Sequence, residues 1–410
     1  MINLYLNRHI FHFFLLGMAS GIPFLLVLST LSFRLTECNI SPSMIGLFTL
    51  VTLPYSLKFL WAPFLERFAY AYFNCRYHGF KVWGVCAQVG LIVSTMLLGA
   101  LDPMIYLSAV AITAFFLSFF ASTQDIVIDA MRVELLATKQ IGAGAAIESI
   151  GFRFGMLIGG AGALYLASMY DWFWAYFIMG GLQVLGIPAL WFIPVENVNA
   201  HTAPLFTFFK TLQNSFKHLY AETPFVYLIL FILFFKIADT VLNAMSAPFL
   251  YELGFDKIEY ANITKSFGIS LMVIGGLVAG YIMHQIGSLF VVGVSLFLQA
   301  VSCLLFIIQS WVGYDLSVLV ITIGVESFAS GMASAAFIAM ISLYCKSPFA
   351  ASHFTFLYAV GSLSRVIASL LAGITADFFG WAWLFFVSAI TTIPAFWFLI
   401  CLKRTRNDRY

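Results

Sequence analysis

Two carboxylates stand four residues apart near the end of a long apolar run, in the stretch "FFASTQDIVIDAMRVELL" at residues 119–136. The i,i+4 spacing places Asp125 and Asp129 on one face of a helix. Carboxylates within a few ångströms of each other resist simultaneous ionisation, so such a pair can take up and release a proton. The pair therefore predicts a proton carrier. The alternative is an ordinary helix end, whose acids are balanced by Arg132 or by basic loop residues.

Ionisable residues also interrupt other apolar runs. At 1.5 Å per residue from the nearer predicted helix end, Arg153, Lys236 and Glu326 each lie about 18 Å deep. A central Asp, Lys or Arg costs about 3 kcal/mol on insertion scales, so such groups must line a wet cavity or pair inside the protein. The candidates for substrate binding or coupling are Lys58, Arg153, Lys236, Asp239, Glu326 and Arg365.

The roles of these six residues are open between ligand binding and structural pairing. Fixed cations suit an anionic substrate, because Arg clasps a carboxylate with two hydrogen bonds and Lys acts as a point charge. Lys58 and Arg153 could instead pair with the two acids of "DIVID". Lys236 and Asp239 are three residues apart on one predicted helix and could pair with each other. The remaining two residues are open between a cavity-facing position and structural pairing.

The composition indicates that a membrane surrounds the elements that carry these residues. The 410 residues are 62% hydrophobic and 9% charged, whereas ordinary soluble proteins have about 25% charged residues. Apolar runs long enough to cross a bilayer start near residues 10, 44, 81, 104, 141, 172, 224, 260, 288, 314, 348 and 381. We predict an all-α integral membrane protein with twelve transmembrane helices in two six-helix bundles.

A long polar interval sets the predicted domain boundaries. They are an N-terminal bundle at 1–195, a cytoplasmic linker at 196–223, a C-terminal bundle at 224–402 and a basic cytoplasmic tail at 403–410. With the amino terminus inside, thirteen of the twenty Lys and Arg residues fall on the cytoplasmic side and two on the other, while five lie within spans. Basic residues favour the cytoplasmic side, so both termini are predicted to be cytoplasmic.

The two halves are weakly similar to each other, as the internal repeats of transporters are. "LTECNIS" after the first span matches "LYELGFD" after the seventh, "FAST" matches "FASG", and "DWFW" matches "GWAW". Glycines at four-residue spacing in the fifth span (Gly151, Gly155, Gly159) predict close helix approach. This approach could be a seam between the halves or ordinary helix packing, and the two interpretations barely differ.

Several classes of function lack their motifs. The six cysteines have no metal or redox spacing, and neither HExxH nor Gly-x-Ser-x-Gly occurs, so we expect no metal, no cofactor and no enzyme. A polytopic membrane transferase is the less favoured alternative. With a net charge of +2 and no long basic tract, we expect no nucleic-acid partner.

Several strings resemble the AmpG muropeptide permeases of the major facilitator superfamily. They are "ASGIPFLLVLSTLSF", "LPYSLKFLWAPFLERF", "TQDIVIDAMRVELL", "GAGAAIESIGFRFGMLIGGAGALYLA" and "ESFASGMASAAFIAM". Lys58, Asp125, Asp129 and Arg153 lie within these strings. Two positions depart from the family pattern: Glu66 in a loosely kept loop signature, and Glu148, where the family implies a neutral residue. We expect the latter to add a local ion pair.

The resemblance implies a specific activity and place. Such a permease imports N-acetylglucosaminyl-1,6-anhydro-N-acetylmuramic acid and its peptides from periplasm to cytoplasm by proton symport, for cell-wall recycling. It is implied to act as a monomer in the cell inner membrane, with muropeptide, protons and lipid as its partners. The alternative is a transporter of acyl-coenzyme A or another anionic metabolite, as in the sister family.

Overall fold

A computed structural model describes residues 8–62, 64–65, 76–135, 138–192, 224–344 and 350–407. Within these ranges every regular element is a helix, and twelve segments are long and apolar enough to cross a membrane. The segments are Phe11–Glu37, Pro42–Leu60, Phe80–Ala100, Leu107–Arg132, Ile147–Met169, Trp172–Trp191, Phe225–Glu252, Lys257–Ile286, Ser288–Val312, Leu316–Tyr344, Phe356–Phe379 and Trp381–Thr405. The predicted all-α membrane fold is confirmed.

The chain forms two compact units whose bounds cut through the second span. The first unit comprises Met1–Cys38 and Leu50–Ala203, and the second comprises Asn39–Thr49 and Pro204–Tyr410. Helix α4 (Pro42–Phe48) thus belongs to the second unit, and helix α5 (Leu53–Leu57) to the first. The linker predicted at 196–223 lies outside the described residues, as does Glu66.

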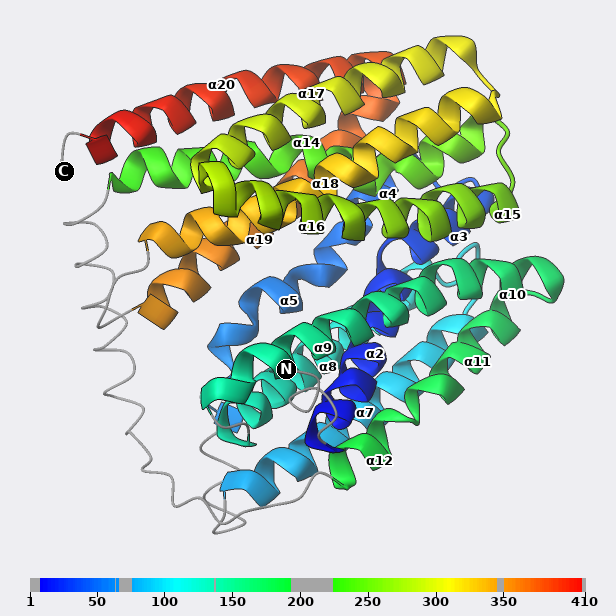
Figure 1. Cartoon of the computed structure of the whole chain (residues 1–410). Coiled ribbons are helices and arrows are strands. Elements are labelled where there is room, and N and C mark those ends of the chain that lie inside the picture. Colours follow the sequence, from blue (N-terminus) through cyan, green and yellow to red (C-terminus); the bar gives the residue numbers. More distant parts are fainter. Residues whose placement is uncertain are drawn as a thin grey trace. The chain divides into compact units, whose positions relative to one another are not determined.

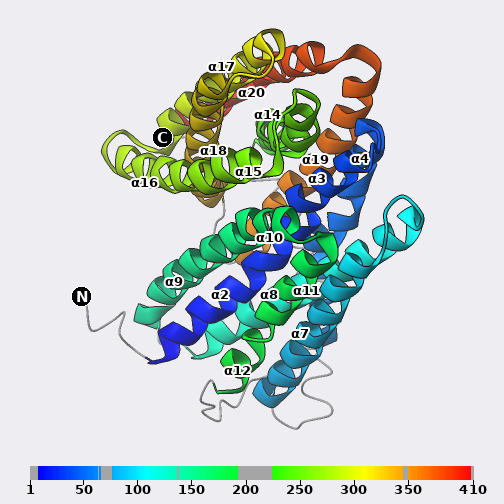
Figure 2. The ribbon, with the colours of Figure 1, turned by 90° about the vertical axis from the view of Figure 1, so that its right-hand side faces the viewer.

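The first unit is a bundle in which α2 and α9 pack along each other (Figure 1; Figure 2). Beyond α5, its elements are α2 Arg8–Val27, α3 Ser29–Glu37, η2 Lys58–Leu60, α7 Arg76–Ala100, α8 Leu107–Leu135, α9 Thr138–Leu157, η3 Ile158–Gly162, α10 Ala163–Met169, α11 Trp172–Gln183 and α12 Gly186–Trp191. The 3₁₀ segment η1, Thr49–Thr52, precedes α5, and the boundary between the units falls within it. A Cβ on Gly151, Gly155 or Gly159 would collide with backbone atoms of α2. These three glycines therefore serve helix packing within this unit.

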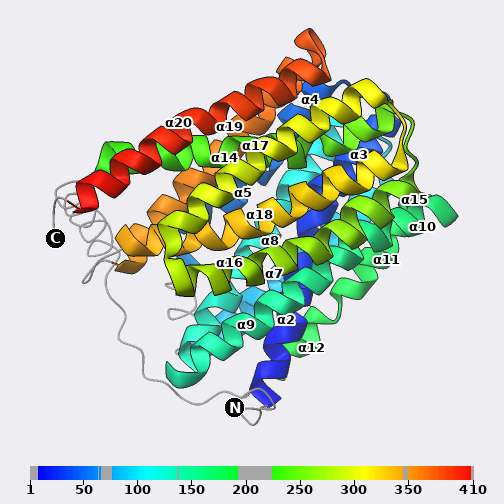
Figure 3. The same cartoon turned by 45° about the horizontal axis from the view of Figure 1, so that its top comes forward.

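In the second unit, α18 packs against both α16 and α17, while α14 packs against α19 and α20 (Figure 3). Its elements are α4, α14 Phe225–Glu252, α15 Lys257–Tyr260, η4 Ala261–Phe267, α16 Gly268–Ile286, α17 Ser288–Val312, α18 Leu316–Tyr344, α19 Ala350–Phe379 and α20 Trp381–Asn407. Phe235 of α14 stacks on Phe337 of α18, with ring centroids 5.6 Å apart and planes at 7°. Both rings are almost fully buried, so they fix the distance between these two helices.

The second span is held at its start by a side chain of α19 and is divided into short helical pieces. At its start, the backbone N–H of Ser43 donates to a carboxylate oxygen of Asp377 at 2.8 Å. An acid at this place satisfies a free N–H at a helix start. Further along, Pro54 lies in the first turn of α5 after the 3₁₀ segment η1, where a missing N–H costs nothing. The span is therefore a series of short helical pieces rather than one straight helix.

The internal repeat is visible as one contact that occurs in both units. In the first, the indole N–H of Trp172 donates to a carboxylate oxygen of Glu37 at 2.8 Å. In the second, Trp381 donates to Glu252, also at 2.8 Å. These four residues belong to the strings that match between the halves. The weak sequence similarity thus corresponds to equivalent side-chain geometry.

Arg34 is buried within the first span, where its guanidinium supplies hydrogen-bond donors to the free carbonyl groups at the end of another helix. Its guanidinium donates to the carbonyl oxygens of Leu98 and Leu101, both at 2.7 Å, at the end of α7. It also lies 5.5 Å from the ring centre of Tyr176. Hydrogen bonds from a charged donor contribute about 1.5–3 kcal/mol each, so this cation is a structural C-cap.

Candidate functional site

The first unit contains a chain of ion pairs around Asp129. One of its carboxylate oxygens lies 3.4 Å from the ammonium of Lys58, and the other accepts from Arg132 at 2.7 Å. Arg132 also pairs with Glu148 of α9. The expected ion pair at Glu148 is thus present, and it extends the network to a third helix. The side chain of Asp129 is 48% exposed, so water can reach the centre of the network.

Asp125 stands beside this network without an ion pair of its own among the described residues. Its carboxylate accepts a hydrogen bond from the Ser20 hydroxyl of α2. It is partly buried and lies within electrostatic range of both Lys58 and Asp129. The two aspartates therefore have different environments: one is shared by two cations, and the other is held by a neutral donor.

The sequence around Lys58 explains why its ammonium reaches α8. The residue begins the 3₁₀ segment η2, directly after the short helix α5, which starts at Leu53. The indole N–H of Trp61 donates to the Thr123 hydroxyl at 3.1 Å, and its ring lies 5.1 Å from that of Phe119. Because Trp61 anchors the segment against α8 at Thr123, the Lys58 ammonium is directed at Asp129, which lies further along the same helix.

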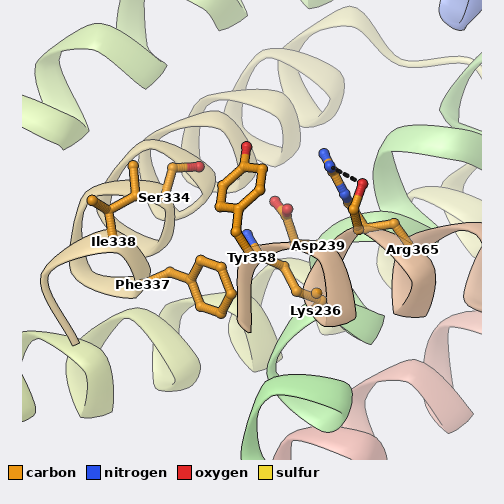
Figure 4. A pocket seen from close by; sticks show the side chains of 9 residues that line it. Lys236, Asp239, Ser334, Phe337, Ile338, Tyr358 and Arg365 are labelled. Atoms are coloured by element: carbon orange, nitrogen blue, oxygen red, sulfur yellow. Dashed lines mark hydrogen bonds between the residues drawn. The ribbon is translucent and has the colours of Figure 1, made fainter. Parts of the chain in front are cut away.

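Charged residues of the second unit line a pocket of about 110 Å³ (Figure 4). It is lined by Lys236, Asp239, Ser334, Phe337, Ile338, Tyr358, Gly361, Ser362 and Arg365, from helices α14, α18 and α19. Three of the six residues singled out from the sequence thus meet in one cavity. Lys236 and Asp239 do not form the intrahelical ion pair that their spacing allowed. Instead the ammonium lies 4.4 Å from the ring centre of Phe337.

Asn243 links the pocket to a second carboxylate. Its amide nitrogen donates to the backbone carbonyl of Asp239 at 2.8 Å, to the carboxylate of the same residue at 3.4 Å, and to Glu326 at 3.2 Å. Glu326 is 8% exposed and also accepts from the Ser327 hydroxyl at 2.9 Å. No described Lys, Arg or His lies within 4.0 Å of this buried carboxylate.

The other predicted residues are placed as follows. Arg365 lines the pocket and donates to the Ser362 hydroxyl at 2.9 Å. Arg153 lies on α9, partly buried, and no described Asp or Glu is within 4.0 Å of it. Pairing with the acids of α8 was open for both Lys58 and Arg153, and the structure shows it for Lys58 alone of these two.

Sequence reasoning missed three polar partners. Ser20 lies in an apolar span, Asn243 follows Asp239 by one helical turn, and Tyr358 lines the pocket as an aromatic among many. The spacing of Asn243 was a usable signal, because i,i+4 residues share a helix face. Nothing local marks the other two. Within the described ranges, no three His, Cys, Asp or Glu side chains gather in a way that could hold a metal ion.

Comparisons with known proteins agree on the kind of molecule. The family model described as Major Facilitator Superfamily matches residues 11–256 and 228–409. A protein of Rickettsia typhi named as a transporter, AmpG 3, is 31% identical over 405 residues, covering 96% of each chain. One of Rickettsia bellii, named AmpG 1, is 30% identical over 409 residues, covering 97% of this chain and 99% of its own.

Solved structures share the fold at low identity. A bacterial homologue of the human lysosomal transporter Spinster, in an inward-facing and unoccupied conformation, has a TM-score of 0.70 at 15% identity, covering 97% of this chain and 96% of its own. The nucleoside transporter NupG has a TM-score of 0.73 at 12% identity, with 96% and 99% covered. At these identities the likeness concerns the fold alone.

Proposed function

We propose a specific cargo for this chain, which is a multi-pass membrane transporter and belongs to the Major Facilitator Superfamily. It imports anhydro-muropeptides by proton symport. The cargo is N-acetylglucosaminyl-1,6-anhydro-N-acetylmuramic acid and its peptides, carried from periplasm to cytoplasm across the inner membrane. Both chain ends are cytoplasmic, and the protein acts as a monomer. The AmpG names of relatives at about 30% identity support this cargo.

The observation that carries the proposal is the charge balance of the network in the first unit. Asp125, Asp129 and Glu148 supply three carboxylates, and Lys58 and Arg132 supply two cations. With every group ionised, the described members of the cluster carry one negative charge in excess. An uncompensated charge inside a membrane protein is costly, so one bound proton makes the cluster neutral.

Asp129 is the acid on which this proton acts most directly. It is the most exposed of the paired carboxylates, and both cations of the network contact it. Protonation removes the negative charge that Asp129 presents to Lys58, and the ammonium can then attract another anion. The carboxylates of the muropeptide lactyl and peptide groups supply such an anion. In this scheme Asp125 and Asp129 couple the proton, and Lys58 links the proton to the cargo.

The pocket of the second unit supplies further substrate contacts. Lys236 and Arg365 offer cationic donors to substrate carboxylates, since neither has a carboxylate within 4.0 Å among the described residues. Arg153 is assigned the same role in the first unit. Asp239 and Glu326 complete the assigned set as acids beside these cations.

The test uses purified protein in sealed vesicles with an imposed inward proton gradient. The wild-type protein is expected to accumulate labelled anhydro-muropeptide against its gradient. Asp129→Asn removes the exchangeable proton and should abolish accumulation, while the protein stays folded by thermal unfolding. Asp102→Asn, an exposed acid in a loop of the first unit, is the matched control and should accumulate cargo at the wild-type level.

Two outcomes would overturn the proposal. If Asp125→Asn and Asp129→Asn both accumulate cargo at the full rate with unchanged pH dependence, these carboxylates do not couple protons. If wild-type vesicles convert the muropeptide chemically rather than concentrate it, the activity is enzymatic.

A further inference from the structure

The pocket of the second unit holds charges of both signs that do not neutralise each other. Lys236 and Asp239 are one turn apart on α14, yet no N···O distance between them is within 4.0 Å, and Arg365 donates to a hydroxyl instead of the carboxylate. In Figure 4 these three side chains surround the same hollow, together with Tyr358. A pocket built only to attract anions would need no acid.

Aromatic rings keep the Lys236 ammonium away from its neighbour. The ammonium lies 4.4 Å from the ring centre of Phe337 and 5.7 Å from that of Phe235. A cation over an aromatic face is attracted by the negative charge of the ring face, and this attraction competes with an ion pair to Asp239 on the same helix. The stacked rings thus hold this buried cation in place without neutralising its charge.

The neutral side-chain amide of Asn243 donates a hydrogen bond to the Asp239 carboxylate. Asn243 donates to it at 3.4 Å, and the same nitrogen reaches Glu326 at 3.2 Å. Since these amide hydrogens are shared among several oxygens, the carboxylate keeps lone pairs available for another donor. Glu326 adds a second acid on the other side of Asn243, and Asp239 itself lines the pocket, where it can accept from a cation. Arg365 and Lys236 line the same pocket and can donate to an anion.

We infer that this pocket binds a zwitterionic amino-acid group, in which a free ammonium contacts Asp239 and a free carboxylate contacts Arg365 and Lys236. The inference rests on the proposed function and adds a preference within it. Among peptide-bearing cargoes, those that end in a diamino-dicarboxylic acid with its amino group free are bound more tightly than those in which this amino group is blocked. The disaccharide part contacts the protein elsewhere.

Two probes isolate the ammonium. One is an anhydro-disaccharide peptide that ends in a diamino-dicarboxylic acid, and the other is the same molecule with that amino group acetylated. Both keep every carboxylate. Binding to purified wild-type protein is measured by the rise in unfolding temperature over a range of probe concentrations, so no transport is needed. A hydrogen bond between charged groups is worth about tenfold or more in affinity, and the free amine is expected to bind at least that much more tightly.

Variants assign the preference to named residues. Asp239→Asn should bring the two probes to equal affinity, because it removes the charge that distinguishes them. Lys236→Gln should weaken both probes by the same factor, since both carry the carboxylate. Lys403→Gln, which removes a charge near the end of α20, is the control and should keep the preference. Asp239→Asn is also compared by its unfolding temperature without probe, so that a folding defect is recognised.

The outcomes separate this inference from the proposed function. Equal affinity of the two probes for wild-type protein overturns the inference, as does a preference that survives in Asp239→Asn. If vesicles fail to concentrate either probe although the binding preference is present, proton-driven import is wrong and the zwitterion site stands. A preference that is lost in Asp239→Asn and kept in Lys403→Gln supports it.

Discussion

At the residue scale, Glu148 carries the clearest consequence of the charge count. Glu148→Gln leaves two carboxylates against two cations among the described members of the network, so these members are neutral without a proton. We predict that this variant exchanges muropeptide across the vesicle membrane at the wild-type rate but loses proton-driven accumulation. The measurement compares exchange at equal pH with uptake under an inward proton gradient. Accumulation equal to that of the wild type would show that Glu148 serves only as a partner of Arg132.

From the sequence, the candidate charged residues were easier to identify than the partners with which they interact. Intramembrane acids and bases stand out against apolar neighbours, so Asp129 and Lys236 were identifiable from the chain alone. Their partners depend on helices that are distant in sequence. Lys236 could reach Asp239 within its own helix, but Phe337 of α18 provides a competing position for the ammonium. That choice follows from tertiary packing, which no local spacing records.

At the element scale, the crossing of α2 and α9 depends on the absence of side chains. A Cβ at Gly155 would meet the carbonyl oxygen of Met18 and the backbone of Gly21, and a rigid helix backbone cannot move aside locally. We predict that Gly155→Ala destabilises the protein by about 1–3 kcal/mol, the usual effect of overpacking. The measurement is the midpoint of thermal unfolding in detergent.

A glycine of the second unit provides the matched control. A Cβ at Gly280 of α16 would have no heavy atom within 4 Å among the described residues. Alanine is the better helix former by about 0.5–1 kcal/mol, so Gly280→Ala should leave the midpoint unchanged or raise it. An equal fall in both variants would mean that the loss of stability does not come from the crossing of α2 and α9. The four-residue glycine spacing predicted close approach, but the partner helix was known only from the structure.

At the scale of the whole molecule, the twelve spans were predictable because length and hydropathy alone determine which segments can cross a bilayer. Their starts near residues 172, 288 and 381 agree with Trp172–Trp191, Ser288–Val312 and Trp381–Thr405. The division of the second span between the units was not predictable, because it depends on the contact of α4 with α19. Apolar patterning shows that a helix is buried, and it does not show against which neighbour.

The orientation of the chain is a further prediction at this scale. The excess of basic residues in loops assigned to the inner side places both ends in the cytoplasm. A green fluorescent protein fused after Tyr410 should therefore fluoresce, whereas alkaline phosphatase fused at the same position should be inactive. The reverse pair of results would invert every loop and, with it, the proposed direction of transport.

The position of α4 has a consequence for how this chain could have been assembled from two genes. If the chain were divided after the first bundle, the N-terminal fragment would carry α4. The contacts of α4 at Gly46 and Ser43 are made with α19, including Asp377, which would lie on the other fragment. Separately synthesised halves would then associate by packing α4 of one fragment on α19 of the other.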